Sequence, residues 1–237
     1  MAESSLPEIH PYPMPTAGEL PRNTASWTVD PARAVLLIHD MQRYFLRPFP
    51  EGTSPRTELV AHTVALRTAA AAADVPVWYT AQPGGMTPEQ RGLLVDFWGA
   101  GMSAEPGHRQ IIDELAPGPG DVVFTKWRPS AYFRTGLLDM LQEAGRDQLV
   151  ICGVYAHVGI LQTACEGFAH GIRTFLAADA LADFSAADHR MTLEYAATRC
   201  AVVLPTRDIR AAFSAPSDVR ETAAVAGGVP AGAGERS

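Results

Sequence analysis

The sequence predicts a three-layer α/β/α sandwich, in which helices cover both faces of a central, mostly parallel sheet. Short runs rich in β-branched residues alternate with longer stretches rich in Ala and Leu, which is the pattern of repeated strand–helix units. Several of the short runs are apolar throughout, as expected for strands buried on both faces. The 237 residues are 47% hydrophobic and 19% charged, which suits one domain with a well-filled core.

The strands are expected at the short apolar runs. The first run, Ala34–His39, is apolar almost to its end and is followed by an acidic residue. Parallel strands joined through helices have right-handed crossovers, so the carboxyl ends of the strands lie at one edge of the sheet. The expected strands are Ala34–His39, Val77–Thr80, Val122–Thr125, Gln148–Cys152, Arg173–Ala178 and Ala201–Leu204.

Helices are expected between these strands, where the runs are longer and Ala and Leu dominate. Gly and Pro mark the connections Arg47–Pro55, Gln82–Pro88 and Phe97–Pro106 as loops. Residues 1–213 are expected to form the folded domain, whereas residues 214–237, which have little to bury, are predicted to be a disordered tail. The expected helices are Glu58–Ala73, His108–Leu115, Gly136–Ala144, Gly159–His170 and Ala186–Arg199.

Charge and composition argue against several classes of partner. The net charge of −7, without a basic stretch, disfavours nucleic acid, although a few local cations could still bind a small anionic substrate. The longest apolar runs have the length of strands, so no membrane span is expected. Met1–Glu19 lacks a secretion signal, so a cytoplasmic location is expected. The cysteines (Cys152, Cys165 and Cys200) lack metal-site spacing, and their odd number argues against a disulfide framework, so neither a metal nor a cofactor is expected.

A carboxylate and an ammonium group follow two of the expected strands. Asp40 comes directly after Ala34–His39, and Lys126 directly after Val122–Thr125. Parallel sheets bind ligands beyond the carboxyl ends of their strands, so a partly desolvated Asp40 could act as an acid there, with Lys126 holding it or a substrate carboxylate. Taken singly, such an Asp is more often a turn or capping residue, and such a Lys is more often solvated. His39 is expected to point to the opposite side of the strand from Asp40, which argues against a dyad of the two.

Further polar and aromatic residues lie near the other strand ends. Gln82 follows the second strand, and Arg91 and Trp98 lie in the segment after it. Beyond the fourth strand the chain runs into a helix whose first N–H groups could hold an anion, with Tyr155 offering a hydroxyl and Gly159 leaving open space. Each signal is weak alone, but an acid, a cation and an anion site at converging strand ends together indicate an active site.

Five segments of the chain together resemble the isochorismatase family, and the match runs from about Pro7 to Phe213. The resemblance implies an isochorismatase-like hydrolase fold. It also implies a non-proline cis peptide near Val154–Tyr155, a strained feature of the kind found at functional sites. The matching segments are His39–Pro48, Tyr79–Pro83, Thr125–Arg128, Gly153–Gly159 and Ala178–Ser185.

Within this family the chain is most similar to the phenazine-pathway members, which hydrolyse 2-amino-2-deoxyisochorismate to trans-2,3-dihydro-3-hydroxyanthranilate and pyruvate. The resemblance implies that Asp40 protonates the methylene carbon of the enolpyruvyl ether without a covalent intermediate, and that Lys126 hydrogen-bonds Asp40 or a substrate carboxylate. It further implies a homodimer, with the loop of His157 as a candidate contact. The residues implied to line the substrate site are Gln82, Arg91, Trp98, Tyr155 and Gly159.

Other activities stay open at this point. Gly159 corresponds to the nucleophile position of related cysteine hydrolases, so an acyl-enzyme is not expected, and Cys152 and Cys165 are expected to be core residues. An isochorismatase that forms 2,3-dihydro-2,3-dihydroxybenzoate is one alternative. Siderophore versions of that enzyme often carry a carrier domain, which the short tail could not form. A non-catalytic scaffold member is the other alternative, and the retention of Asp40 with Lys126 argues against it.

Overall fold

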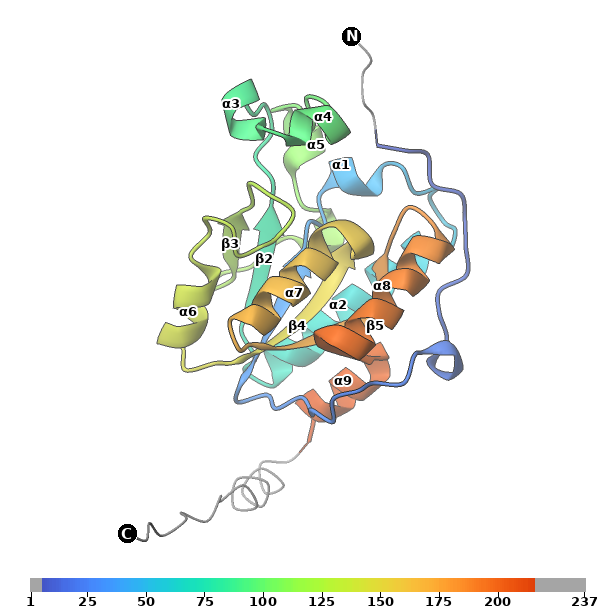
Figure 1. Cartoon of the computed structure of the whole chain (residues 1–237), viewed down its shortest axis with the longest axis vertical. Helices are drawn as coiled ribbons and strands as arrows, with labels where there is room; N and C mark the ends of the chain where they lie inside the picture. Colours follow the sequence, from blue (N-terminus) through green and yellow to red (C-terminus); the bar gives the residue numbers. More distant parts are fainter. Residues whose placement is uncertain (1–5, 216–237) are drawn as a thin grey trace, which may run out of the picture.

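The computed structural model describes residues 6–215 and has a six-stranded sheet at its centre (Figure 1). All neighbouring strands are parallel, in the order β3-β2-β1-β4-β5-β6, so the direction in which strands are added reverses between β1 and β4. The predicted α/β sandwich is confirmed. The strands are β1 (Ala34–His39), β2 (Val77–Ala81), β3 (Val122–Thr125), β4 (Gln148–Val154), β5 (Arg173–Ala182) and β6 (Ala201–Leu204).

All of the expected strands form, and three of them run further than expected. The strand β2 continues through Ala81, β4 through Val154 and β5 through Ala182. Asp179 interrupts the apolar pattern of β5, which bulges between Leu176 and Leu181, and the pairing with β4 resumes at Leu181 and Ala182. The extension carries β4 directly to the segment that is expected to bind the substrate.

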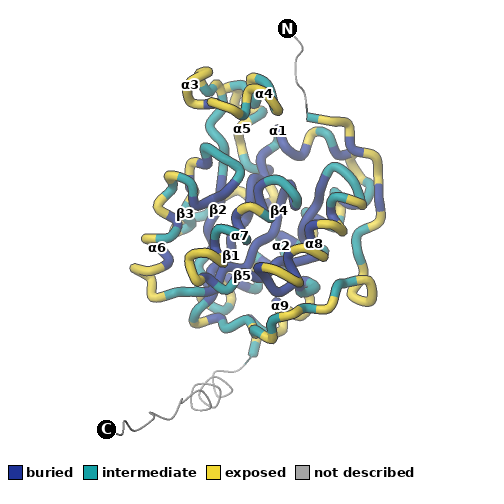
Figure 2. Tube along the Cα trace, in the orientation of Figure 1, coloured by how far each residue is buried: buried dark blue, intermediate teal, exposed yellow. Residues whose placement is uncertain are grey.

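Two groups of helices bury the two faces of the sheet. One face packs against α2 and α9, and the other against α6, α7 and α8. The side chains of β1 alternate accordingly: Leu36 and Ile38 belong to the first core, and Val35 and Leu37 to the second. Figure 2 shows the central strands buried and the outer helix faces exposed. The helices are α2 (Arg56–Ala72), α6 (Leu137–Glu143), α7 (Leu161–Ala169), α8 (Ala186–Arg199) and α9 (Thr206–Phe213).

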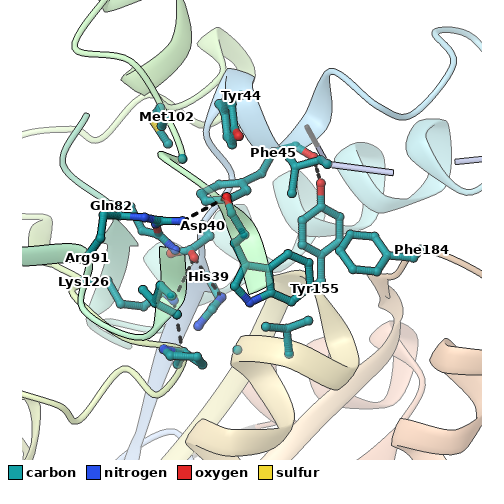
Figure 3. Close-up of a pocket in the computed structure, with 17 residues that line it drawn as sticks. His39, Asp40, Tyr44, Phe45, Gln82, Arg91, Met102, Lys126, Tyr155 and Phe184 are labelled. Atoms are coloured by element: carbon teal, nitrogen blue, oxygen red, sulfur yellow. Dashed lines mark hydrogen bonds and ion pairs between the residues drawn. The ribbon is translucent and has the colours of Figure 1, made fainter. Parts of the chain in front are cut away.

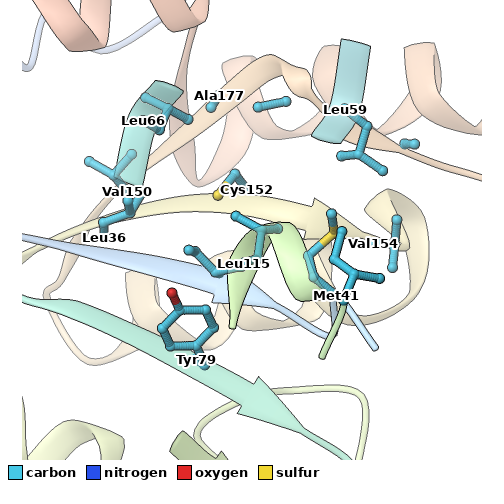
Figure 4. Close-up of a cluster of buried hydrophobic side chains, with 14 of the residues drawn as sticks. Leu36, Met41, Leu59, Leu66, Tyr79, Leu115, Val150, Cys152, Val154 and Ala177 are labelled. Atoms are coloured by element: carbon cyan, nitrogen blue, oxygen red, sulfur yellow. The ribbon is translucent and has the colours of Figure 1, made fainter. Parts of the chain in front are cut away.

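The helix α2 shows why one of these faces is stable. Its buried residues Leu59, Thr63, Leu66 and Ala70 recur every three or four positions and form one stripe of the helix. Figure 4 shows Leu59 and Leu66 with the strand residues Leu36, Val150 and Cys152 in this core. Cys152 is fully buried, as expected. Cys165 of α7 is only partly buried, and its Sγ lies 3.7 Å from that of Cys200.

The prediction of a helix over His108–Leu115 is wrong. The helix α5 (Pro106–Arg109) ends early, and the chain then forms an antiparallel bridge between Gln42 and Ile111 before the short turn η2 (Asp113–Leu115). The backbone N–H of Ile112 donates to the carbonyl of Met41 at 3.0 Å. Pairing with the segment after β1 therefore uses backbone groups that a continuous helix would need.

Short helices gather at the carboxyl edge of the sheet. Those of the α3–α5 segment project from the body of the molecule as a small lobe, seen in green at the top of Figure 1. The helix α4 also takes in the start of the expected loop Phe97–Pro106. The remaining short elements are η1 (Ala17–Glu19), α1 (Arg43–Leu46), α3 (Pro88–Arg91), α4 (Leu94–Trp98) and the π-helical turn η3 (Ala156–Ile160), which precedes α7.

Within residues 6–215, every helix is too short or too polar to cross a membrane. The same residues hold no group of three or more His, Cys, Asp or Glu side chains placed to bind a metal ion. Of the predicted tail, residues 216–237 lie outside the described residues.

Candidate active site

A pocket of about 590 Å³ opens at the carboxyl edge of the sheet (Figure 3). It lies beside the ends of β1 and β4, where the strand order reverses, and this is the position at which open parallel sheets bind their ligands. The structure brings every predicted site residue into its wall. These residues are Asp40, Gln82, Arg91, Trp98, Lys126, Tyr155 and Gly159.

Asp40 and Lys126 form a buried ion pair at the bottom of the pocket. Lys126 Nζ lies 3.0 Å from Asp40 Oδ2, and both side chains are almost completely buried. Thr80 Oγ1 donates a hydrogen bond of 2.6 Å to Asp40 Oδ1. Lys126 Nζ also donates to the carbonyls of Arg128 and Pro129, at 3.1 and 3.2 Å. The ammonium group is therefore held by three oxygen atoms, and the carboxylate has a fixed orientation.

The pKa of Asp40 reflects opposing influences. Burial raises it, but the cation of Lys126 and the hydrogen bond from Thr80 lower it, and the net shift is below the usual aspartate value. Asp40 is therefore a carboxylate in the free protein at neutral pH. Protonation of Asp40 would need a group that offsets the charge of Lys126.

The expectation that His39 points away from Asp40 is wrong. Side chains alternate only while the backbone stays extended, and Asp40 leaves the strand with a left-handed φ of 52°. Both side chains therefore line the pocket, with His39 Nδ1 3.9 Å from Asp40 Oδ2. His39 Nδ1 lies 2.7 Å from the carbonyl of Val154, which can only accept, so we assign the proton to Nδ1. Burial lowers the pKa of His39 to about 4, so the ring is neutral at pH 7.

Arg91 brings a second buried cation to the pocket. Its side chain donates to the carbonyls of Gly99 and Trp98, at 3.1 and 3.2 Å, and burial lowers its pKa. Among the described residues, no carboxylate lies within ion-pair distance of Arg91. A buried guanidinium group without a carboxylate partner has the charge and the geometry to bind an anionic group.

Gln82 is held in the wall through its backbone. Gln42 accepts from the Gln82 N–H at 2.7 Å and donates to the Gln82 carbonyl at 2.9 Å. Gln42 also donates to the carbonyl of Arg109 at 2.6 Å, so one buried side chain joins the end of β2 to the lobe. The side chain of Gln82 itself faces the pocket (Figure 3).

An aromatic wall faces these polar groups. The rings of Tyr155 and Phe184 lie 4.4 Å apart, and Trp98 packs 5.8 Å from Phe184. The Tyr155 hydroxyl, expected to face the substrate, instead donates to the carbonyl of Phe45, so the ring is what Tyr155 offers to the pocket. The Val154–Tyr155 peptide is cis, as the resemblance implies.

The anion site expected at the start of the helix after β4 is already filled. The carboxylate of Asp183 accepts from the His157 N–H at 2.6 Å and lies 2.7 Å from His157 Nδ1. The protein thus supplies its own anion there, and His157 anchors the loop. Its hydrogen bond with Asp183 raises the pKa of His157.

Some residues of the site escape the sequence reasoning. Thr80 and Gln42 act through partners that are 40 positions away in the sequence, so no local pattern reveals their hydrogen bonds. Thr80, Gln42 and Phe184 all lie in family segments, and this was the available signal for them. Leu94 and Met102 of the lobe complete the apolar lining.

Fold and site together define an α/β protein with a buried carboxylate and two buried cations in one pocket at the carboxyl edge of its sheet. Residues 34–208 match the model of the isochorismatase domain, and the chain belongs to the isochorismatase family. The protein is therefore an isochorismatase-type hydrolase.

Named relatives agree with this assignment, and a solved structure shares the fold. The chain is 58% identical over 206 residues to the phenazine biosynthesis protein PhzD1 of Pseudomonas aeruginosa, covering 87% of this chain and 99% of that protein. It is 51% identical over 224 residues to the isochorismatase of Bacillus subtilis, covering 94% of this chain and 72% of that protein. A cysteine hydrolase from Pseudomonas syringae shares the fold, with a TM-score of 0.72 at 24% identity over 81% of this chain and 97% of that one.

Proposed function

We propose that the protein hydrolyses the enolpyruvyl ether of 2-amino-2-deoxyisochorismate to trans-2,3-dihydro-3-hydroxyanthranilate and pyruvate. The observation that carries this proposal is the buried Asp40–Lys126 pair in a pocket where Gly159 offers no nucleophile. Among the described residues lining the pocket, Asp40 supplies the sole carboxylate. Relatives named for phenazine biosynthesis, at 58% and 54% identity, favour the 2-amino substrate.

A vinyl ether is cleaved after protonation of its terminal carbon, and this step needs a single acid. Asp40 delivers a proton to the methylene carbon, which leaves an oxocarbenium ion at the neighbouring carbon. Water adds there, and its proton returns to Asp40. The hemiketal then collapses to the keto group of pyruvate and the ring hydroxyl. General-acid catalysis of this kind contributes on the order of 10²–10⁴-fold in rate.

Substrate binding is what protonates Asp40 in this mechanism. Its carboxylates bring negative charge to a pocket that holds Lys126 and Arg91, and so offset the cation that lowers the pKa of Asp40. The aromatic wall shields the pocket from bulk solvent, which strengthens these interactions. Proton uptake by Asp40 is therefore coupled to binding.

Covalent catalysis by a cysteine does not fit this site. Cys152 is fully buried in β4, and burial raises the pKa of its thiol to about 12. Cys165 lies on α7 and is absent from the pocket wall. Hydrolysis by acid and water suits the residues that are present.

Isochorismatase activity is the second candidate, and the 51% identity to the Bacillus subtilis enzyme favours it. The two substrates differ in one ring substituent, which is remote from the protonated carbon. A non-catalytic scaffold is disfavoured because the Asp40–Lys126 pair is intact.

Pyruvate release from both substrates tests the proposal. We expect turnover of both, with the higher kcat/KM for the 2-amino compound, and one solvent deuterium in the methyl group of fresh pyruvate formed in D₂O. A higher kcat/KM for isochorismate would assign the second activity. Pyruvate without deuterium, measured before exchange, would exclude proton delivery to carbon.

We also propose, from the family resemblance, that the protein acts in the cytoplasm as a homodimer. Light scattering at assay concentrations is expected to give twice the chain mass of 25.4 kDa. A mass equal to that of one chain would contradict this.

A further inference from the structure

His39 and Gly159 pack against each other beside the Asp40–Lys126 pair. A Cβ atom added to Gly159 would overlap with Cε1 of His39 and lie 2.9 Å from its Nε2, closer than real Cβ atoms approach their neighbours. The backbone of Gly159 does not have the positive φ that favours glycine. Glycine is therefore required at this position by the neighbouring ring and not by the backbone conformation.

The ring of His39 has little freedom to move aside. Its Nδ1 is held 2.7 Å from the Val154 carbonyl, and its side chain is 1% exposed. Its backbone pairs with Gly153 of β4, and the two chains lie so close that a Cβ atom at Gly153 would overlap with the His39 carbonyl oxygen. Both the ring and the backbone of His39 are therefore held in place.

The blocked direction leads to the catalytic pair. The added Cβ atom at Gly159 would also lie 3.1 Å from the carbonyl oxygen of Pro129. That oxygen accepts from Lys126 Nζ at 3.2 Å, and Nζ lies 3.0 Å from Asp40 Oδ2. A side chain at position 159 would thus begin between the His39 ring and an oxygen atom that holds Lys126.

We propose that His39 is a specificity-determining residue: its ring fills the space beside Asp40 and Lys126 that a side chain at position 159 would need, and so reserves the reaction for an acid and water. The functional meaning rests on the proposed ether hydrolysis. A neutral imidazole suits this role, because it fills the space without placing another cation beside Asp40.

A double-mutant cycle tests the packing without any substrate. Gly159→Ala should lower the urea midpoint clearly more than Gly18→Ala, where a Cβ atom has no neighbour within 4 Å. His39→Asn is smaller and keeps an N–H for Val154, so adding it to Gly159→Ala should restore part of the loss. Equal midpoints for Gly159→Ala and Gly18→Ala, or no recovery in the double variant, would overturn the proposal.

A thiol at position 159 tests the consequence for chemistry. Gly159→Cys with His39→Asn should be alkylated at that position at least about tenfold faster than Gly159→Cys alone, because the smaller Asn leaves room for the thiol beside Lys126, where its thiolate is favoured. Mass spectrometry separates this site from the native cysteines. Equal rates in the two backgrounds would show that His39 does not control the space. Neither this readout nor the urea midpoints depend on which ether is hydrolysed.

If His39→Asn does not fold, the ring can be observed directly in Gly159→Ala. The imidazole nitrogen resonances of His39 should shift from their wild-type positions, because the ring must yield to the methyl group. Unchanged resonances in a folded Gly159→Ala variant would overturn the proposal. Failure of Gly159→Ala to fold while Gly18→Ala folds would support it.

Discussion

Opposing demands meet at Asp40. The free protein stabilises its carboxylate through Lys126 and Thr80, whereas ether cleavage needs the protonated acid. In the proposed reaction the substrate is itself anionic, so its binding would offset the charge of Lys126 and let Asp40 take up the proton. A permanently protonated Asp40 would instead leave Lys126 as an unpaired buried cation in the free protein, which is costly.

Replacing Asp40 should remove turnover without removing binding. Asp40→Asn keeps the size of the side chain but has no acidic proton, so we expect kcat to fall by at least about 10³-fold with the substrate Kd changed far less. Stopped assays of pyruvate and calorimetric titration with substrate measure the two effects. Asp147→Asn, a matched change at a surface ion pair with Arg33, should retain kcat. Wild-type kcat in Asp40→Asn would disprove the assigned acid.

Hydrogen bonding from Thr80 should set the pH range of activity. The pKa of Asp40 lies below its usual value, so its protonated fraction, and with it kcat/KM, should fall about tenfold per unit as the pH rises through neutrality. Thr80→Val removes a donor to the carboxylate and should raise the pKa of Asp40, moving this decline upward by about one pH unit. Profiles of kcat/KM against pH for both proteins check the shift. A move toward lower pH would contradict it.

Several residues that line the pocket were predictable because they follow strand ends or lie in family segments, as Asp40, Gln82, Lys126, Tyr155 and Gly159 do. Asp40 and Lys126 come directly after their strands, so the parallel sheet brings them together. The orientation of His39 was not predictable, since it depends on the left-handed backbone at Asp40. The Asp183 carboxylate that fills the expected anion site was equally hidden, because it comes from the end of another strand.

Among the elements, those with a strong apolar pattern were predicted and those made by tertiary pairing were not. The strand β1 and the helix α2 follow directly from apolar periodicity. The segment His108–Leu115 has a helical composition, yet it pairs with the chain after β1. Backbone pairing between distant segments outweighs local preference there, and composition carries no sign of it.

The position of the lobe that carries Arg91 should depend on Arg128. Arg128 Nη1 donates to the Gln90 carbonyl at 2.7 Å, next to Arg91, and so ties the lobe to the chain after β3. We expect Arg128→Ala to raise KM by about tenfold with a smaller change in kcat, because one charge-assisted hydrogen bond of this kind contributes about 1.5 kcal/mol. Steady-state kinetics measure the changes in KM and kcat separately.

A matched control for this change is Arg134→Ala, because Arg134 lies over the same Phe133 ring at 5.0 Å. This variant removes a cation–π contact similar to that of Arg128 and should leave KM unchanged. An equal rise of KM in both variants would assign the effect to the Phe133 cluster and not to the lobe.

For the whole molecule, the alternation of strands and helices was enough to predict a parallel sheet between two helical layers. The strand order was not predictable in the same way, because any of several orders buries these strands equally well. The order decides which strand ends lie next to each other, and the reversal between β1 and β4 is what opens the pocket beside Asp40.

The stability of the whole fold should fall between pH 6.5 and about 4, the range set by buried neutral histidines. The pKa of His39 is lowered by burial from 6.5 to about 4, and that of His189 is lowered for the same reason. In this pH range these histidines are protonated in the unfolded chain but stay neutral in the folded chain. The free energy of unfolding therefore decreases as the pH falls, by on the order of 3 kcal/mol for His39 alone. Carboxylates with lowered pKa values lose their contribution mainly below this range, and the raised pKa of His157 acts above it. Urea unfolding at a series of pH values should therefore show a slope that His39→Asn largely flattens and that His10→Asn, at an exposed position, leaves unchanged. A flat wild-type profile, or an undiminished slope in His39→Asn, would show that His39 takes up its proton in the folded state.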